Sequence, residues 1–378
     1  MYIVSALTSE SLPAYAGLYD VFSQTAQQNY AWDHQPLPLS VLGDLLANHY
    51  LHGYGLVEMA TQEPAGLMLY RQEPHRSLEI NVIIQSDAAR QNNKVFLDVL
   101  MRKFLSDCRQ LPQWDVISYA MLGQQSDLIN TMTWYGFKPV GQAIVNFNML
   151  DPIHVQILKT RQYPPMPDGL TLTTFAEQAA VQADFPGVPF LKGLVDTVYE
   201  AFHTSTDALW DPRFRTREGV KNVLQSVLQG EMGDFVPEAT SLILNQDQTP
   251  VALCLMIQPE MLKGNIPIVA IQNAYRGKYL SKPLLQKAIE SAIDGMLNAT
   301  VAISSIHATL DTDNIAAIQM YRSVGFTETS HYPHVYLPRA SFQPDYREPD
   351  ATTSETQHPS LWVSQQLNPA YHHPATRF

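Results

Sequence analysis

The stretch that decides the fold runs from Ile268 to Ile289 and reads Ile-Val-Ala-Ile-Gln-Asn-Ala-Tyr-Arg-Gly-Lys-Tyr-Leu-Ser-Lys-Pro-Leu-Leu-Gln-Lys-Ala-Ile. An apolar strand pattern is followed by a short basic turn with one glycine and then by the spacing of an amphipathic helix. The first N–H groups of a helix lack intrahelical acceptors, and the helix dipole favours negative charge there. The turn therefore predicts an anion site that suits a pyrophosphate. Pro283 fits the first helical turn, where a missing N–H costs nothing. Three side chains add positive charge: Arg276, Lys278 and Lys282.

A second informative stretch covers residues 309–326. It predicts a helix that is capped by Asp313 and ends before Gly325, because glycine readily takes the left-handed backbone that follows a helix. Three residues at positions i, i+3 and i+7 share one face of this helix: Asn314, Ala317 and Tyr321. By itself, Tyr321 is open to two interpretations, a catalytic phenol or a core ring whose hydroxyl lies at a wet edge.

Together the two stretches resemble motifs A and B of the GNAT acetyltransferase superfamily. Motif A is an apolar strand followed by Tyr-Arg-Gly-x-Gly-x-Gly/Ala-x-x-Leu-Leu, and motif B is Asn-x-x-Ala-x-x-x-Tyr-x-x-x-Gly-Phe. Motif B is matched at each of these positions, whereas Tyr279 and Ser281 replace the two inner glycines of motif A. A side chain there crowds a phosphate that lies on the backbone. The resemblance covers residues 170–339 directly.

The resemblance implies an acetyl-CoA-dependent N-acetyltransferase, an acyltransferase in which the acetyl carbonyl lies against a strand amide near Ile271. The pantetheine of CoA would lie between two splayed strands that end near Gln272 and Thr309. Tyr321 would protonate the departing thiolate or donate a hydrogen bond to it, and Asn314 and Ala317 would line the cofactor side of their helix. The residues implied to cradle the pyrophosphate are Arg276, Gly277, Lys278, Tyr279, Leu280, Ser281 and Lys282.

The general base is left open by the sequence, because the strand before the turn has no carboxylate at a place where some family members keep one. A chain of water molecules is one alternative. The side chains that could serve instead are Glu200, His203, Asp211 and His307.

An internal duplication extends the resemblance to the N-terminal half. Arg276 follows Arg90 by 186 positions, and Val251 follows Ala65 by the same number. The Gly-Phe that ends motif B follows a second Gly-Phe, at 136–137, by 189 positions. Because short apolar runs and turn residues recur in the same order in both halves, we interpret the chain as two repeats of one fold.

The expected fold class is α/β (α+β): two tandem GNAT-like lobes, each a mixed, mostly antiparallel twisted sheet flanked by helices. We expect lobes over residues 1–150 and 170–339, joined by a proline-rich linker over 151–169 and followed by a Pro-rich polar tail over 340–378. In the tail, Leu361-Trp362-Val363 could dock onto a lobe. The pair His372 and His373 lacks further spaced ligands, so no metal site is expected.

The N-terminal lobe is expected to be degenerate. Residues 90–95, which correspond to the anion turn, contain no glycine. Counting back from Gly136 places Met132 where Tyr321 stands and Gln125 where Asn314 stands, so no phenol is available for a leaving thiolate. We therefore expect this lobe to be structural or to help shape the acceptor pocket.

Composition narrows the partners. The 378 residues carry a net charge of -12 and a pI of about 5.4, which argues against nucleic acid or an anionic membrane and is compatible with an amine acceptor. Cys108 and Cys254 stand among apolar neighbours and are expected to be buried free thiols. Neither a signal peptide nor an apolar run long enough to cross a bilayer is present, so we expect a cytoplasmic protein. Homodimers are common enough that one is expected.

Three functions remain open at this level. The leading hypothesis is acetyl transfer to the amine of a small molecule or peptide within a direct ternary complex. The alternative is a non-catalytic acyl-CoA-binding or regulatory protein, in which Tyr279 and Ser281 mark a decayed site. A third, aminoacyl transfer from tRNA on a similar duplicated fold, is disfavoured because tRNA requires a basic track.

Overall fold

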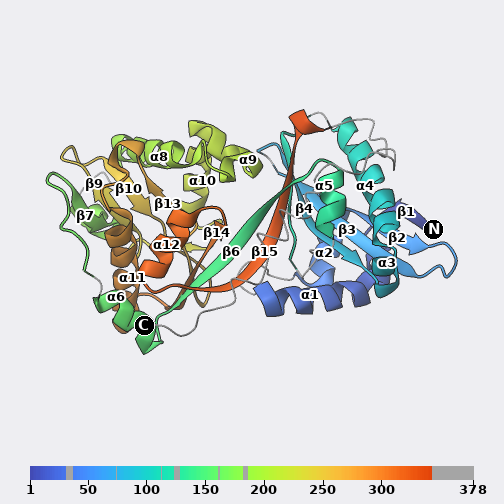
Figure 1. Ribbon diagram of the computed structural model, residues 1–378, viewed down its shortest axis with the longest axis horizontal. Helices are drawn as coiled ribbons and strands as arrows, with labels where there is room; N and C mark the ends of the chain where they lie inside the picture. Colours follow the sequence, from blue (N-terminus) through green and yellow to red (C-terminus); the bar gives the residue numbers. More distant parts are fainter. Residues whose placement is uncertain are drawn as a thin grey trace, which may run out of the picture. The chain divides into compact units, whose positions relative to one another are not determined.

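The computed structural model describes residues 1–30, 37–73, 75–111, 113–122, 128–160, 162–181 and 186–342 (Figure 1). The chain forms two compact units: unit 1 comprises Met1–Gln142 with His331–Phe378, and unit 2 comprises Ala143–Ser330. Gln125 and the tail from residue 343 onward, including Leu361-Trp362-Val363, His372 and His373, lie outside the described residues.

These units differ from the predicted lobes over 1–150 and 170–339. The last residues of strand β15 (Thr327–Pro338) pair antiparallel with β5 (Val116–Ala120) of unit 1, from His334 opposite Ala120 to Pro338 opposite Val116. The end of the chain's second repeat is thus part of the sheet of the first, a long-range pairing that no local pattern encodes. Part of the predicted linker, residues 152–160, forms a helix.

Unit 1 is a sheet with strand order β1-β2-β3-β4-β5-β15 and helices against it. All neighbouring pairs are antiparallel except β4 with β5. Its other strands are β1 (Tyr2–Ala6), β2 (His52–Glu58), β3 (Pro64–Gln72) and β4 (Ser77–Gln85). Its helices are α1 (Ala16–Tyr30), α2 (Leu39–Ala47), α3 (Asp87–Gln91), α4 (Asn93–Gln110) and α5 (Ile129–Trp134).

The core of unit 1 follows from the periodicity of α4. Phe96, Leu100 and Phe104 recur every four residues and are fully buried against the sheet. Each such side chain contributes roughly 1.5–3 kcal/mol through its removal from water. Cys108, one turn further along, is a buried free thiol, as is Cys254 in unit 2, which confirms the prediction for both cysteines.

Unit 2 contains two sets of strands. A four-stranded sheet has the order β13-β10-β9-β7, and the strands of the second set have the order β6-β14-β12-β11-β8. The first set is β7 (Thr171–Thr174), β9 (Ser241–Leu244), β10 (Pro250–Cys254) and β13 (Val269–Ile271). The second set is β6 (Lys138–Asn148, of which the part from Ala143 belongs to unit 2), β8 (Asp234–Phe235), β11 (Ile257–Glu260), β12 (Leu262–Asn265) and β14 (Ile303–Asp311). The helices are α6 (Pro152–Thr160), α7 (Phe175–Val181), α8 (Val188–Phe202), α9 (Asp207–Trp210), α10 (Arg217–Leu228), α11 (Ser281–Leu297) and α12 (Ile315–Ser323).

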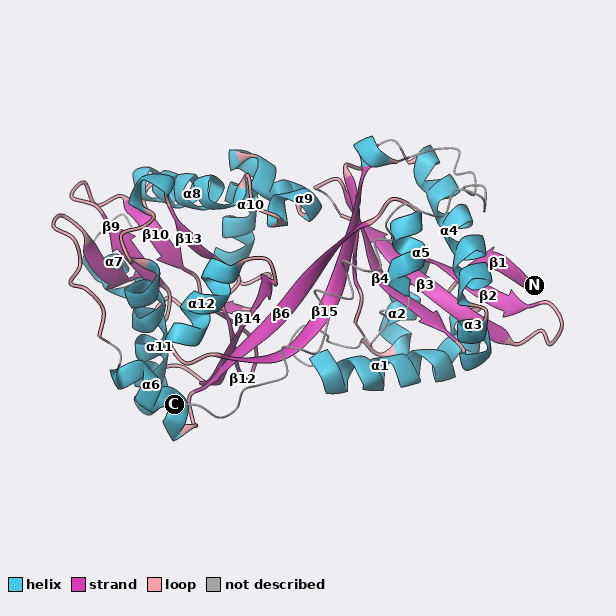
Figure 2. Cartoon of the chain, viewed as in Figure 1, coloured by secondary structure: helices cyan, strands magenta, loops and turns pink. Residues whose placement is uncertain are grey.

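The helices of unit 2 pack on two faces of the strands, because side chains alternate between the two faces along each strand (Figure 2). Cys254 on β10 belongs to the core cluster that contains residues of α11 and α12. The adjacent Leu253 belongs to a second cluster, with residues of α8 and α10. Because neighbouring strand residues point to opposite faces, one short strand serves both cores.

One hairpin of unit 2 is interrupted on both of its sides. The apolar runs over residues 251–257 and 266–271 are each divided between two strands, so that the hairpin passes from one set of strands to the other. Pro267 lies in the second interruption and has no N–H to donate. On one side of it, the Ile266 N–H donates to His307 O at 2.9 Å. On the other side, the Leu255 N–H donates to Ile268 O at 2.9 Å.

No helix within the described ranges is both long enough and apolar enough to cross a bilayer.

Candidate functional site

The turn between β13 and α11 has the geometry of an anion site. It starts with a short 3-10 helix over Asn273–Tyr275, and Gly277 then takes a left-handed backbone with φ +75°. A Cβ built on Gly277 would meet no atom within 4 Å, so the backbone here is open. The turn can therefore be approached closely from outside.

The N-terminus of α11 is not capped by any described side chain. Leu280 is the N-cap residue and, being apolar, accepts no hydrogen bond with its side chain, and no acidic residue lies in the first turn. The first intrahelical bond after the cap runs from the Leu284 N–H to Leu280 O, at 3.2 Å. The N–H groups of Ser281 and Lys282 precede that bond, and Pro283 has none. This helix end offers donors and the positive end of a dipole, as predicted from the sequence.

Basic side chains surround the turn. The Lys278 ammonium lies 4.8 Å from the centroid of the Tyr275 ring, and that of Lys282 lies 6.0 Å from the ring of Tyr163. Arg276 is exposed but held by carbonyls: its Nη2 donates to Ala201 O at 3.2 Å and its Nε to Ile271 O at 3.4 Å. All three cations lie on or beside the turn, so an anion bound there would be partly neutralised.

Tyr279 stands where the motif has a glycine, and its backbone is left-handed. Its φ is +60°, in the left-handed region, and 70% of the residue is exposed. A non-glycine residue there is destabilised by roughly 1–2 kcal/mol. Since the ring is mostly in solvent, it does not fill the turn.

The edge of β13 provides a second set of backbone donors. Two hydrogen bonds fix the pairing of β13 with β10: the Leu255 N–H donates to Ile268 O, and the Gln272 N–H donates to Val251 O. The backbone N–H and C=O groups of the even-numbered residues here therefore face β10. Val269 and Ile271 consequently point their N–H groups away from β10, at the free edge of the four-stranded sheet.

The two predicted splayed strands belong to different sets. β13 ends at Ile271, one residue before the expected Gln272, and lies in the four-stranded sheet. β14 ends at Asp311, two residues beyond the expected Thr309, and lies in the other set. β14 is parallel to β12 only up to the pair of Asn265 and His307.

Tyr321 lies in the core of unit 2, in the cluster that also contains residues of β10, β14 and α11. It is 5% exposed, and its ring packs edge-on against Phe326 at 4.9 Å between centroids. Burial, reinforced by the Cys254 thiol, raises the pKa of Tyr321 well above its ordinary value, so the phenol stays protonated. Burial likewise raises the pKa of Cys254 to about 12.

The start of α12 corrects one prediction. Asn314, not Asp313, is the N-cap residue, and its side chain accepts from the Ala317 N–H at 3.1 Å. The side chain of Asn314 therefore satisfies a helix donor. Ala317 packs against the core cluster that contains Tyr321. The predicted left-handed residue after the helix is confirmed, with φ +105° at Gly325.

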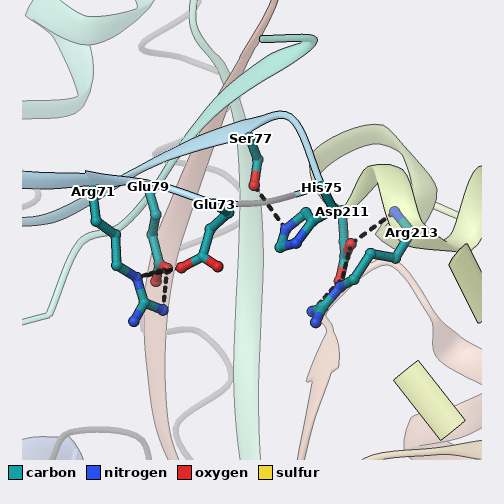
Figure 3. Close-up of polar contacts among 7 residues, drawn as sticks. All are labelled: Arg71, Glu73, His75, Ser77, Glu79, Asp211 and Arg213. Atoms are coloured by element: carbon teal, nitrogen blue, oxygen red, sulfur yellow. Dashed lines mark hydrogen bonds and ion pairs between the residues drawn. The ribbon is translucent and has the colours of Figure 1, made fainter. Parts of the chain in front are cut away.

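Three of the four candidate bases make structural contacts. Glu200 Oε2 accepts from the Asn273 N–H at 3.3 Å. His203 stacks on Tyr199 with centroids 4.6 Å apart. Asp211 forms an ion pair with Arg213 at 2.7 Å, which Figure 3 shows together with the unit 1 cluster of Arg71, Glu73 and Glu79.

The fourth candidate base, His307, is 2% exposed. Burial lowers its pKa to about 4, although a hydrogen bond with the Gly264 backbone acts in the opposite direction. It is therefore neutral near pH 7 and a weak base.

The unit 1 counterpart of the turn is built differently. Residues 90–95, which stand 186 positions before 276–281, run from the last turn of α3 into α4 and contain no glycine. The short helix α3 is capped by Ser86, whose side chain accepts from the Ala89 N–H at 3.2 Å, and has Asp87 in its first turn. Within the described part of the chain, the start of α4, the counterpart of α11, has no side-chain cap at Asn92 and no acidic residue in its first turn. Met132, which stands where Tyr321 is in unit 2, is fully buried.

Unit 1 also holds an open polar cavity of about 380 Å³ that contains none of the predicted site residues. It is lined by His49, Tyr50, His52, Gln72, Glu73, Arg76 and Gln113. The sequence carries no signal for it, because these residues come from three separate segments without a common motif.

Comparison with solved structures identifies the fold. The chain matches a GCN5-related N-acetyltransferase from Sphaerobacter thermophilus with a TM-score of 0.58 and 17% identity, over 89% of this chain and 95% of that one. It matches a tandem GNAT protein from the clavulanic acid biosynthesis pathway with a TM-score of 0.51 and 8% identity, over 91% and 100% of the two chains. It also matches a glucosamine N-acetyltransferase region of a fungal multi-domain GH3 beta-N-acetylglucosaminidase, with a TM-score of 0.51 and 10% identity, over 89% of this chain and 38% of that one.

No family model matches the sequence, and no curated protein matches it significantly. The structural similarity is nevertheless spread over about nine tenths of the chain. The chain therefore has the fold of the GNAT N-acetyltransferases. More specifically, it has a tandem GNAT architecture, as predicted from the duplicated motifs.

Proposed function

We propose that the protein is an acetyl-CoA-dependent N-acetyltransferase whose site lies in unit 2. The observation that carries this proposal is the uncapped N-terminus of α11 behind a basic, open turn. Such a helix end leaves donors unsatisfied unless an anion or water binds them. Its place after the edge strand of a GNAT fold makes the pyrophosphate of CoA the best candidate.

The residues present fit acetyl-CoA. Backbone groups from Arg276 to Lys282 would hold the pyrophosphate, with Lys278 and Lys282 supplying positive charge. The edge amides of Val269 and Ile271 would hold the remainder of the cofactor along β13. When bound, acetyl-CoA supplies a thioester whose acetyl group is activated for transfer.

Two groups of the chain are suited to the chemistry. The Ile271 N–H is a fixed backbone donor at a free sheet edge, so it can stabilise negative charge on an acyl oxygen without reorganising. Tyr321 Oη holds its proton at neutral pH because burial raises its pKa, so it can donate to a thiolate. Tyr321 belongs to the same core cluster as Cys254 of β10, and the Cys254 thiol helps to raise the pKa of the phenol.

The acceptor proposed is the unprotonated amine of a small molecule or peptide. The net charge of -12 is compatible with a cationic substrate. Glu200, His203 and Asp211 are bound in structural contacts, and His307 is buried, weakly basic and hydrogen-bonded to the Gly264 backbone, which favours proton removal by water.

Unit 1 is proposed not to bind the cofactor. Residues 90–95, which correspond to the anion turn, run from α3 into α4 without a glycine, so the open turn that precedes α11 has no counterpart in unit 1. Its role would be structural or in shaping the acceptor pocket.

The decisive experiment places a negative charge at the start of α11. Ser281→Asp puts a carboxylate at the first position of this helix. CoA affinity measured by calorimetry should fall more than about tenfold, while the free energy of unfolding should be unchanged or raised by about 0.5 kcal/mol, because a carboxylate there favours the helix dipole. Ser281→Ala is the matched control and should bind CoA like the wild type. Equal CoA affinity in Ser281→Asp and Ser281→Ala would exclude this helix end as the cofactor site.

A non-catalytic acyl-CoA-binding protein is the second candidate, favoured by the side chains of Tyr279 and Ser281 at glycine positions of the motif. It predicts CoA binding without acetyl transfer to any member of a broad panel of amines. The same titration followed by a transfer assay distinguishes the two functions.

A further inference from the structure

One face of α8 is bonded to the turn at three points. Thr197, Glu200 and Ala201 occupy positions i, i+3 and i+4, so they lie on the same side of the last two turns of the helix. Glu200 Oε2 accepts from the Asn273 N–H at 3.3 Å, and Ala201 O accepts from Arg276 Nη2 at 3.2 Å. α8 therefore holds the turn both at a backbone group, the Asn273 N–H, and at a side chain, the Arg276 guanidinium.

Thr197 is the buried centre of these contacts. It has no exposed surface, and its hydroxyl accepts from Gln272 Nε2 at 3.0 Å. Its single proton can be donated to Gly193 O at 2.8 Å or to Pro250 O at 2.9 Å. One hydroxyl thus links α8, β10 and the first residue of the turn. Removing it would leave buried polar groups with one partner fewer.

α8 itself is fixed closely against the sheet. A Cβ built on Gly193 would lie 2.8 Å from side-chain atoms of both Thr249 and Pro250, so only glycine allows this approach. On the same helix, Phe190, Leu194 and Val198 are buried in the core cluster shared with α10. The helix is a rigid support.

We propose that this face of α8 sets the shape of the anion turn, with Thr197 and Glu200 as positioning residues for cofactor binding. The inference rests on the proposed function, because it assigns these residues to the CoA turn. It also removes Glu200 from the candidate bases: its carboxylate holds a backbone N–H of the turn. Without these bonds, the donors at the start of α11 would lose their fixed geometry, and binding would have to order them.

The test uses isosteric pairs in the full chain. Thr197→Val removes the hydroxyl at nearly constant volume, whereas Thr197→Ser retains it. Asp196→Asn is the control on the same helix. The Asp196 carboxylate pairs with Arg217, and within the described residues no bond joins it to the turn. The measurements are CoA affinity by calorimetry, KM and kcat with acetyl-CoA, and hydrogen exchange of peptides covering residues 272–282.

We expect Thr197→Val to weaken CoA binding about tenfold, the equivalent of 1.4 kcal/mol, and to raise KM for acetyl-CoA more than it lowers kcat. Amides of 272–282 should exchange faster, while those of β9 and β10 should keep their rates. Thr197→Ser and Asp196→Asn should stay close to the wild type. Unchanged CoA affinity and unchanged exchange of the turn in a folded Thr197→Val protein would overturn the proposal.

Glu200 provides an independent variant if Thr197→Val does not fold. Glu200→Gln retains an oxygen acceptor for the Asn273 N–H, and Glu200→Ala does not. Faster turn exchange and weaker CoA binding in Glu200→Ala alone support positioning. Equal losses in both variants would contradict it and point to a need for the charge. If the wild type binds no CoA, the proposed function fails, yet turn exchange in the absence of ligand still tests the support by α8.

Discussion

Cys254 of β10 and Val269 of β13 face each other as the last pair of the four-stranded sheet before both strands are interrupted. They form a non-hydrogen-bonded pair, so the Val269 N–H points to the free edge. Cys254 and Tyr321 belong to the same core cluster, and the thiol helps burial to raise the pKa of the phenol. The pair of Cys254 and Val269 therefore joins the core of unit 2 to the free edge of β13.

Tyr321→Phe tests the phenol as a proton donor. We expect kcat to fall about 10²- to 10⁴-fold, the usual contribution of a positioned acid, with CoA affinity unchanged within about twofold. Steady-state kinetics and calorimetry give the two values. Tyr199→Phe on α8 is the control, because it keeps the aromatic ring that stacks on His203 and should keep full activity. A fully active Tyr321→Phe enzyme would remove this residue from the mechanism.

Tyr279→Gly tests whether the side chain on the turn weakens cofactor binding. Glycine relieves the left-handed strain of about 1 kcal/mol but also makes the unfolded chain more flexible, so the unfolding free energy should change by less than about 1 kcal/mol. CoA should bind about threefold more tightly or better, because the backbone becomes more accessible. Tyr279→Asn separates the effects, since asparagine tolerates this backbone but retains a side chain. Weaker binding by the glycine variant would show that the ring contacts the cofactor favourably.

His307 should make unit 2 sensitive to acid. Burial lowers its pKa to about 4, whereas the unfolded chain takes up the proton near 6.5. As the pH falls from about 6.5 to 4, the unfolded state binds a proton that the folded state does not, and stability is lost, by about 3 kcal/mol at most. Chemical denaturation at a series of pH values should show a shallower loss for His307→Gln. His49→Gln, at an exposed position, should follow the wild-type curve, and identical curves for all three proteins would contradict the assignment.

Unit 1 should bind no cofactor. Calorimetric titration with CoA is expected to give one site per chain, and Ser86→Ala should leave this stoichiometry unchanged while lowering the stability of unit 1 by about 1 kcal/mol through loss of a helix cap. Two sites per chain in the wild type would show that unit 1 also binds CoA, although residues 90–95 contain no glycine.

Local patterns in the sequence were sufficient for the repeated architecture and for the strand, turn and helix around Gly277. The strand and the helix from Ser281 follow from hydrophobic periodicity, and the turn follows from the left-handed backbone that Gly277 allows. The uncapped start of the helix follows from the apolar side chain of Leu280. Each of these effects acts between close neighbours along the chain. The left-handed position of Gly325 follows for the same reason.

Tertiary structure decided what depends on contacts between distant residues. Nothing in the local pattern predicts that Thr197 hydrogen-bonds to Gln272, that β15 ends in the sheet of unit 1, or that Tyr321 and Cys254 share one core cluster. The interruption of two apparently continuous strands around Pro267 also depends on pairing with β14 at His307. Sequence patterns report which face of an element is buried, but partners across the core are chosen by packing and by the requirement that buried polar groups find hydrogen bonds.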